Sequence, residues 1–440
     1  MFAYQLRIAW KSIRRNLGHS LIVAGGIALG VAVSTLFATV RHSYAKDPLP
    51  GKSDSLFYVR LDSWDPHQSY PGDIGPPPQI TYQDMAGIMR SDIPTHQSGM
   101  FKTSLYVFPP DASRGRPELE QIRLCFSDFF AMFDVPFRYG GAWDRKADAG
   151  PESVVVISEE MNDRLFGGEN SVGKSVRIQD RQFRVVGVLD HWRPGVKFYD
   201  LTQFQVQAVE PVYMPFNWVR PMELRTAGNS DGWKSPSQFG FAGIFGSETA
   251  WIQMWVELPT ADHLARYRAF LDAYALEQRK AGRFQRPLDN RVRTISQVMA
   301  DFKIVPEEAT ATMMVSLLFL LICSLNLIGL LLGKFLARGA EIGVRRAMGA
   351  RRLDVFVQHI LECELVALAG GAVGLLLAAG GVELVNLWTK TMFQRSDFFQ
   401  VDWAMAGFAT SAALVAGLIA GLYPALRVCR IAPAVHLKTQ

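Results

Sequence analysis

The residue pattern that most directly suggests chemistry is a glycine-rich octapeptide at residues 168–175, which reads Gly-Glu-Asn-Ser-Val-Gly-Lys-Ser. It satisfies the phosphate-binding pattern G-x-x-x-x-G-K-[ST], in which backbone N–H groups and the lysine hold the phosphates of ATP or GTP. That chemistry needs a strand before the loop and a helix after it. Here the residue types predict the reverse order, a helix at 159–166 and a strand at 175–179. We therefore expect a helix-to-strand turn that does not bind nucleotide.

The other residue types that commonly carry chemistry are scattered. The four cysteines, at positions 125, 323, 363 and 429, form no C-x-x-C pair, and the eight histidines lack the spacing of metal ligands. No H-E-x-x-H sequence occurs, and no hydrophobic run ending in aspartate offers a magnesium partner for residues 168–175. We therefore expect this chain to have no catalytic residue, metal or cofactor of its own.

Four uncharged stretches are long enough to cross a lipid bilayer. They are residues 21–40, 311–333, 365–382 and 404–423, and the last is expected to stop at Pro424. A helix of about 20 apolar residues matches the hydrocarbon core, which is roughly 30 Å thick. Core helices of soluble proteins rarely run this long without a polar face, and the first stretch is too long for a secretory signal. The sequence therefore predicts four transmembrane helices.

Basic residues gather on one set of flanks of these stretches. Arg7, Lys11, Arg14 and Arg15 precede the first stretch, and a second basic group lies at 334–352. Because positive charge in short flanks marks the cytoplasmic side, we expect both termini in the cytoplasm and residues 42–310 outside. We expect these charges to flank the membrane and to bind no nucleic acid. Glu362 and Glu364, near the inner end of the third span, are expected at the membrane interface.

The large segment between the first two spans alternates between strand and helix patterns. Strands are expected at 153–157, 175–179 and 183–189, and helices at 159–166, 262–279 and 295–302. The predicted fold class is an α-helical membrane protein with four transmembrane helices and a large α+β extracytoplasmic domain inserted between the first two. The expected organisation is an interfacial amphipathic helix at 1–18, spans at 19–41, 311–333, 361–385 and 403–424, an outer domain of one or two subdomains at 42–310, an inner elbow at 334–360, a short outer loop at 386–402 and a cytoplasmic tail at 425–440.

The inner loop between the second and third spans is the most informative segment. Glu341 and Arg345 have the i,i+4 spacing of an ion pair on a short helix, and Gly349 permits a bend before a second amphipathic helix. An anchor for anionic lipid would need only the basic residues. The glutamate, the glycines and the elbow favour an element that docks another protein. The candidate docking residues are Arg338, Glu341, Ile342, Gly343, Arg345, Arg346, Met348, Gly349 and Arg351.

This loop resembles a known family signature. The run Arg338-x-x-Glu341-Ile342-Gly343-x-Arg345-x-Ala347-x-Gly349-Ala350 is similar to the cytoplasmic motif of the FtsX-like permeases of ABC systems (type VII), which include the MacB exporters and the lipoprotein-releasing LolC and LolE. Residues 155–158, 165–168, 172–174 and 183–188 resemble the MacB-type periplasmic domain, and 424–425 with 431–433 resemble the family's C-terminal ending. Residues 190–258 match nothing familiar.

The resemblance implies partners and a mechanism. It implies a dimer of identical or different permease chains in the bacterial inner membrane, driven by an ABC ATPase that binds ATP and magnesium and contacts the inner loop. Because no nucleotide domain precedes residue 21 or follows residue 423, we expect the ATPase as another polypeptide. MacB-like members further imply a periplasmic adaptor, an outer-membrane duct and export by mechanotransmission.

Four other functions remain open at this point. A lipoprotein-extracting permease of the LolC/LolE type has the same plan and would need an apolar cradle in the outer domain. A regulator of cell-wall hydrolases, as FtsX is, usually has a smaller outer domain. A sensor would need a cytoplasmic output domain, and a membrane enzyme would need a catalytic set.

Overall fold

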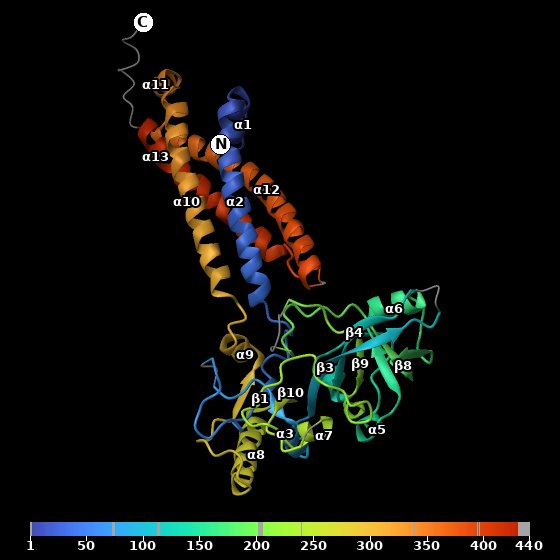
Figure 1. Cartoon of the computed structure of the whole chain (residues 1–440). Coiled ribbons are helices and arrows are strands. Elements are labelled where there is room, and N and C mark those ends of the chain that lie inside the picture. Colours follow the sequence, from blue (N-terminus) through green and yellow to red (C-terminus); the bar gives the residue numbers. More distant parts are fainter. Residues whose placement is uncertain are drawn as a thin grey trace. The chain divides into compact units, whose positions relative to one another are not determined.

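The computed structural model describes residues 2–72, 75–111, 115–200, 206–238, 240–337, 339–393, 395 and 397–429. The chain divides into two compact units, Met1–Ala45 with Val305–Gln440, and Lys46–Ile304. We call the first the helical unit and the second the inserted domain, since its residues lie between two helices of the first. Figure 1 shows the two units with their element labels.

The helical unit contains the expected spans. Its helices are α1 Phe2–Arg15, α2 Leu17–Ala45, α10 Glu307–Leu336, α11 Gly339–Ala347, α12 Arg352–Phe393 and α13 Trp403–Cys429. Among the described residues, four of these, α2, α10, α12 and α13, are long and apolar enough to cross a membrane. The prediction of four transmembrane helices around an inserted domain is thus confirmed.

One helix end differs from its prediction. Pro424 does not stop the last helix, because α13 continues to Cys429 with Pro424 buried inside it. A proline removes one backbone hydrogen bond, but neighbouring helices often compensate for this loss in membrane helices. Ala425 and Val428, beyond the proline, are fully buried against the unit and hold this last turn in place. The expected tail beyond residue 429 lies outside the described residues.

Glycines allow the spanning helices to pack closely. A Cβ atom on Gly370 of α12 would lie 2.6 Å from the Ala24 carbonyl oxygen of α2, and one on Gly374 would lie 2.7 Å from that of Ala28. Only a residue without a side chain permits such an approach, which lengthens the run of van der Waals contact between two helices. The G-x-x-x-G pair at 370 and 374 therefore packs α12 on α2 within one chain.

The inserted domain is built on one mixed sheet, which has eleven strands within the described residues. The strands are β1 Leu56–Arg60, β2 Ile80–Thr81, β3 His96–Phe108, β4 Glu118–Cys125, β5 Phe137–Gly140, β6 Val154–Ile157, β7 Ser175–Ile178, β8 Arg181–Leu189, β9 Val212–Pro215, β10 Ala250–Glu257 and β11 Arg291–Thr294. Their order is β11-β1-β10-β3-β4-β9-β6-β8-β5, with β2 paired to β10 and β7 to β3 and β8. The pairs β4/β9 and β6/β8 are parallel.

Helices join these strands, so the expected α+β class is confirmed. They are α3 Tyr82–Ile88, α4 Asp128–Met132, α5 Arg145–Ala149, α6 Glu159–Phe166, the 3₁₀ turn η2 Phe216–Val219, α7 Phe241–Phe245, α8 Ala261–Lys280 and α9 Ile295–Asp301. β6 and β10 are buried along their whole length, as central strands require. α6 begins because the Ser158 hydroxyl accepts a hydrogen bond from the Met161 N–H, and it ends at Gly167 in the left-handed conformation.

Candidate coupling site

The segment between α10 and α12 forms a sharp bend, as the sequence predicts. We call residues 339–351, which comprise α11 and the following turn, the elbow. Gly349 has a φ of +102°, a conformation that side-chain-bearing residues rarely adopt. The Ala350 N–H donates to the Arg345 carbonyl at 3.1 Å, and the Asp354 carboxylate accepts from the Arg351 N–H at 3.2 Å. These contacts close α11 and start α12 within a few residues.

Glu341 forms two ion pairs, one within the elbow and one that joins the elbow to α1. The Glu341 carboxylate lies 2.7 Å from the Arg345 guanidinium, which confirms the i,i+4 pair, and 2.9 Å from that of Arg15 in α1. Arg345 also donates to the Gln358 side-chain oxygen of α12 at 3.3 Å. The side chains of Arg15, Glu341 and Arg345 are all at least one-third exposed, so each pair contributes no more than about 1 kcal/mol to stability. Together they set the orientation of α11 relative to α1 and α12.

The remaining elbow residues separate into a packed side and an exposed side. Ile342 and Gly343 are buried, and Ile342 belongs to the apolar core of the helical unit. Val344 and Met348, one turn apart, are exposed, Met348 at 76%. Leu353, at the start of α12, is 67% exposed. Exposed apolar side chains therefore occur on α11 and at the start of α12, on either side of the Gly349 bend.

The predicted arginines of the elbow have different surroundings. Arg346 donates to the Cys429 carbonyl oxygen of α13 at 3.4 Å and is half-buried, so it joins the elbow to the last helix. Arg351 is exposed, in the segment between Met348 and Leu353. Arg338 lies outside the described residues. The predicted set did not include Val344 and Leu353. Their exposure on an amphipathic segment could have been predicted from the helical period.

A buried polar cluster lies in the same unit, and sequence reasoning missed it. The Lys334 ammonium of α10 lies 2.6 Å from the Glu362 carboxylate of α12, and both side chains are almost fully buried. Ser12 of α1 donates to Glu362 at 2.6 Å, and Lys334 donates to the Ser20 hydroxyl of α2 at 3.2 Å. The sequence analysis expected Glu362 at the membrane interface. The signal that could have found the cluster was an acid and a base, each at the end of an apolar span.

The octapeptide at 168–175 has the element order that the sequence predicts. α6 enters it, and β7 leaves it at Ser175. Gly167 and Gly173 take positive φ angles of 73° and 88°, so their backbone freedom makes the turn. The Lys174 ammonium lies 3.5 Å from the Glu169 carboxylate, and no helix N-terminus faces the loop from its C-terminal side. The turn lacks the geometry of a phosphate-binding loop.

A second enzyme-like pattern escaped the sequence reasoning. Residues 228–232 read Gly-Asn-Ser-Asp-Gly, which satisfies the nucleophile pattern G-x-S-x-G. That chemistry requires a sharp turn from a strand into a helix. The segment instead lies in a loop, in which Asp231 forms an isolated bridge to Ala250 and its carboxylate accepts from the Tyr70 hydroxyl at 2.7 Å. The segment therefore matches the nucleophile pattern in its residue types alone and lacks the backbone geometry that the pattern requires.

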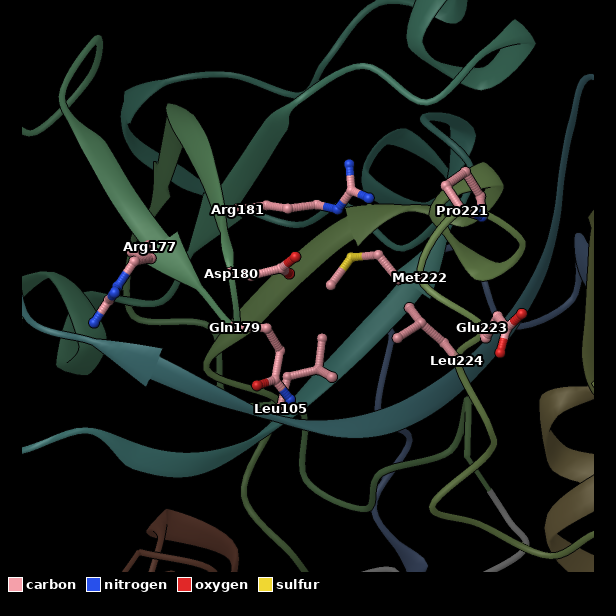
Figure 2. A pocket seen from close by; sticks show the side chains of 9 residues that line it. All are labelled: Leu105, Arg177, Gln179, Asp180, Arg181, Pro221, Met222, Glu223 and Leu224. Atoms are coloured by element: carbon pink, nitrogen blue, oxygen red, sulfur yellow. The ribbon is translucent and has the colours of Figure 1, made fainter.

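The inserted domain has an open groove of about 700 Å³ between the β7–β8 turn and the loop after η2. It is lined by Leu105, Arg177, Gln179, Asp180, Arg181, Pro221, Met222, Glu223 and Leu224. Figure 2 shows the Asp180 and Met222 side chains pointing toward one another across it. Its apolar lining comes from Leu105, Pro221, Met222 and Leu224, and Gln179, Asp180 and Arg181 line it from the β7–β8 turn. Such a groove suits a molecule or chain segment with both apolar and charged groups.

The centre of the inserted domain contains a buried charge network. The Arg123 guanidinium of β4 contacts the Asp200 carboxylate at 2.6 Å and also pairs with Glu210. Lys102 lies 3.2 Å from Asp200, and Lys197 lies 2.6 Å from Glu210. Burial alone would raise the pKa of Glu210, but Arg123 and Lys197 outweigh it and lower that pKa to about 2. The pKa of Asp200 is lowered in the same way, chiefly by Arg123 and Lys102.

Comparison with known proteins gives the two units separate matches. Residues 20–274 match the family model for the MacB-like periplasmic core domain, and residues 313–433 match that for the FtsX-like permease C-terminal domain. The first match includes residues 190–258, which the sequence alone left unmatched. It rests on the inserted domain and the first span, and the second rests on the remaining spans and the elbow.

Individual relatives are distant. The macrolide export ATP-binding/permease protein MacB of Escherichia coli K12 is 23% identical over 456 residues, which cover 98% of this chain and 60% of that protein. The protein with the same description from Syntrophobacter fumaroxidans is 24% identical over 70% of this chain and 46% of its own length. The chain thus spans about half the length of such relatives. The periplasmic region of MacB from Actinobacillus actinomycetemcomitans aligns with 57% of this chain and 94% of its own, at 13% identity and a TM-score of 0.37.

Proposed function

The chain belongs to the MacB-like and FtsX-like permeases of ABC transporters, and we propose that it couples ATP hydrolysis by an ABC ATPase to movement of its inserted domain. In this proposal the ATPase is a separate subunit that binds ATP and magnesium and docks on the elbow. A second permease chain, identical or different, completes the dimer. The transported substrate is taken up outside the inner membrane and passes to an adaptor and an outer-membrane duct.

The proposal places the elbow in the cytoplasm and the inserted domain in the periplasm. Arg15 pairs with Glu341, so the basic helix α1 and the basic elbow lie at the same end of the helical unit. Positive charge at one end of a membrane bundle favours the cytoplasmic side. Both termini are then cytoplasmic, where an ATPase has access to nucleotide.

The open side of the elbow is the observation that carries the proposal. Val344, Met348 and Leu353 are exposed on either side of the Gly349 bend, and Arg351 is exposed in the segment between Met348 and Leu353. Clustered exposed apolar side chains flanked by arginine are typical of protein docking surfaces, and methionine adapts its shape to a partner. Behind them, the ion pairs of Glu341 and the buried Ile342 give the surface a fixed support. A force applied to Met348 would therefore reach α1 and α12 without first deforming the elbow.

The test is to place a charge on this surface. We expect Met348→Glu to lower the affinity for the ATPase subunit about tenfold, because a carboxylate would have to be desolvated in the interface. The measurement is the amount of ATPase that co-purifies in mild detergent, together with ATP hydrolysis by the complex. Leu276→Glu, at an exposed leucine of α8, is the matched control. Wild-type association and hydrolysis in Met348→Glu would contradict the proposal.

The supporting residues test a different step. Glu341→Lys places like charges beside Arg15 and Arg345, and Arg345→Glu does the same toward Glu341. We expect both variants to insert into the membrane normally but to lose coupled ATP hydrolysis, because the docking surface is no longer held in place. Normal hydrolysis in both variants would show that the ion pairs of Glu341 are not needed for coupling.

The groove of the inserted domain favours the export function over lipoprotein extraction. An extractor needs an apolar cradle for acyl chains. The groove is lined by five charged or amide side chains as well as apolar ones, namely Arg177, Gln179, Asp180, Arg181 and Glu223. Transfer of a hydrocarbon chain past so many charged groups is unfavourable, whereas an amphipathic export substrate would meet both kinds of contact.

A further inference from the structure

Four side chains from four helices meet in the buried cluster of the helical unit, which we call the four-helix cluster. They are Ser12 of α1, Ser20 of α2, Lys334 of α10 and Glu362 of α12. The Glu362 carboxylate has one oxygen 2.6 Å from the Lys334 ammonium and the other 2.6 Å from the Ser12 hydroxyl, which donates to it. Lys334 reaches Ser20 at 3.2 Å. The ion pair and its two serine partners thus join α1, α2, α10 and α12.

Stability gives no sufficient reason for this arrangement. Burying an ammonium and a carboxylate costs several kcal/mol each, and their attraction does little more than offset that cost. Well-packed apolar side chains of similar size often hold helices together equally well. An ion pair adds specificity for one arrangement of the helices, because short contacts between charged and hydroxyl groups form in only one register.

The cluster is connected to the elbow through α1. Ser12 and Arg15 are three residues apart, so they lie on the same face of α1, one turn from each other. Ser12 contacts Glu362 of α12, and Arg15 contacts Glu341 of the elbow. α1 is therefore held at two neighbouring points, once to the long helix α12 and once to the elbow that precedes it. A shift of the elbow cannot move α12 alone without breaking one of these contacts.

We propose that Glu362 is a positioning residue for coupling, which fixes α1 and α10 to α12 so that these helices move with the elbow as one body. The inference rests on the proposed function. Lys334 supplies the charge that keeps Glu362 in register, and Ser12 carries the connection to α1. The N-terminal helix is then part of the driven machinery as well as an attachment to the membrane surface.

The test uses the full chain with its ATPase subunit in lipid nanodiscs. Hydrogen exchange of the α1 and α11 peptides is measured with and without a non-hydrolysable ATP analogue, and ATP hydrolysis is measured in parallel. In the wild type, nucleotide changes the exchange of both peptides. In the variant Lys334→Met with Glu362→Met we expect α11 to respond and α1 to respond no longer, with coupled hydrolysis lower by about 2- to 30-fold.

A single substitution removes the connection without removing the charges. Ser12→Ala deletes the hydroxyl that joins α1 to Glu362, whereas Ser324→Ala deletes a buried hydroxyl that bonds only to the Leu320 carbonyl of its own helix at 2.8 Å. We expect Ser12→Ala to weaken the α1 response and Ser324→Ala to leave it intact. This pair gives the test an answer even if the double variant does not fold.

The outcomes separate the two proposals. A wild-type α1 response and unchanged hydrolysis in Ser12→Ala, or in the folded double variant, would overturn the positioning role and leave the proposed function standing. Absence of any nucleotide response in α11 of the wild-type complex would overturn the proposed function itself. A loss of the α1 response in Ser324→Ala equal to that in Ser12→Ala would also overturn the positioning role, because any buried hydroxyl would then suffice.

Discussion

Glu210→Gln removes one negative charge from the network at the centre of the inserted domain without changing the size of the side chain. Glu210 is 1% exposed and pairs with Arg123 and Lys197. With a neutral amide in its place, Asp200 is left as the one carboxylate facing Arg123, Lys197 and Lys102 within the described residues. We expect the variant to fold but to be substantially less stable.

Two separate arguments give the size of the loss. Removing one partner of a buried ion pair typically costs about 3–5 kcal/mol. The pKa of Glu210, lowered from 4.5 to about 2 by Arg123 and Lys197 against the opposing effect of burial, corresponds to about 3 kcal/mol in favour of the ionised form. For a domain of this size such a loss lowers the melting temperature by roughly 6–20 °C.

The same pKa fixes how the loss depends on pH. A carboxylate whose pKa is lowered by folding stabilises the protein above its unfolded pKa, and the stabilisation disappears as the pH falls through the folded pKa. The melting temperatures of wild type and Glu210→Gln should therefore differ fully at pH 7 and converge between pH 4.5 and about 2. Protonated glutamate and glutamine then have the same charge.

The assay is thermal unfolding of the full chain in detergent, followed by tryptophan fluorescence. Trp255 reports on the network, because its indole N–H donates to the Tyr199 carbonyl and the Tyr199 hydroxyl donates to Glu210 at 3.0 Å. The matched control is Glu118→Gln, which affects an exposed pair with Arg164 and should cost less than about 1 kcal/mol. Equal melting temperatures for the two variants at pH 7, or a difference that does not change with pH, would refute the reasoning.

Two further predictions follow from single positions. Lys174→Ala should leave ATP hydrolysis by the reconstituted complex unchanged, because Lys174 contacts Glu169 and the Phe166 ring in a turn without phosphate-binding geometry. Loss of hydrolysis with the complex still assembled would restore the nucleotide-binding interpretation. Gly374→Leu should lower the melting temperature of the helical unit and its yield in membranes, because the new Cβ would lie 2.7 Å from the Ala28 carbonyl oxygen. The control Gly380→Leu should have little effect, because nothing lies within 4 Å of a Cβ at that position. Similar losses in both variants would exclude close packing as the cause.

Local features of the fold could be predicted from the sequence because they depend on neighbouring residues. α6 was predicted at 159–166 and lies at Glu159–Phe166, since Ser158 and Gly167 provide its two caps. The Glu341–Arg345 pair follows from helical spacing in the same way. Hydropathy predicts the four spans because exposing such long apolar segments to water is unfavourable.

Long-range pairs could not be predicted. Arg123 meets Glu210 because the sheet places β4 beside β9, which begins two residues after Glu210, and the chain's order does not reveal this parallel pairing. Lys334 and Glu362 meet because α10 and α12 both pack against α2 and α13, whereas the sequence shows only two charges at the ends of apolar segments. Both networks were missed for this reason, although each of their residues was visible.

The distribution of polar contacts along the helical unit supports movement of the bundle rather than conduction through it. Lys334 and Glu362 bind one another near the elbow, and at the other end of α2 His42 lies 3.2 Å from Asp402 at the start of α13. Between these two points, contact depends on glycine and small apolar side chains, as at Gly370 and Gly374. Helices that are joined by charge at their ends and closely packed between them are suited to transmit a push from one side of a membrane to the other.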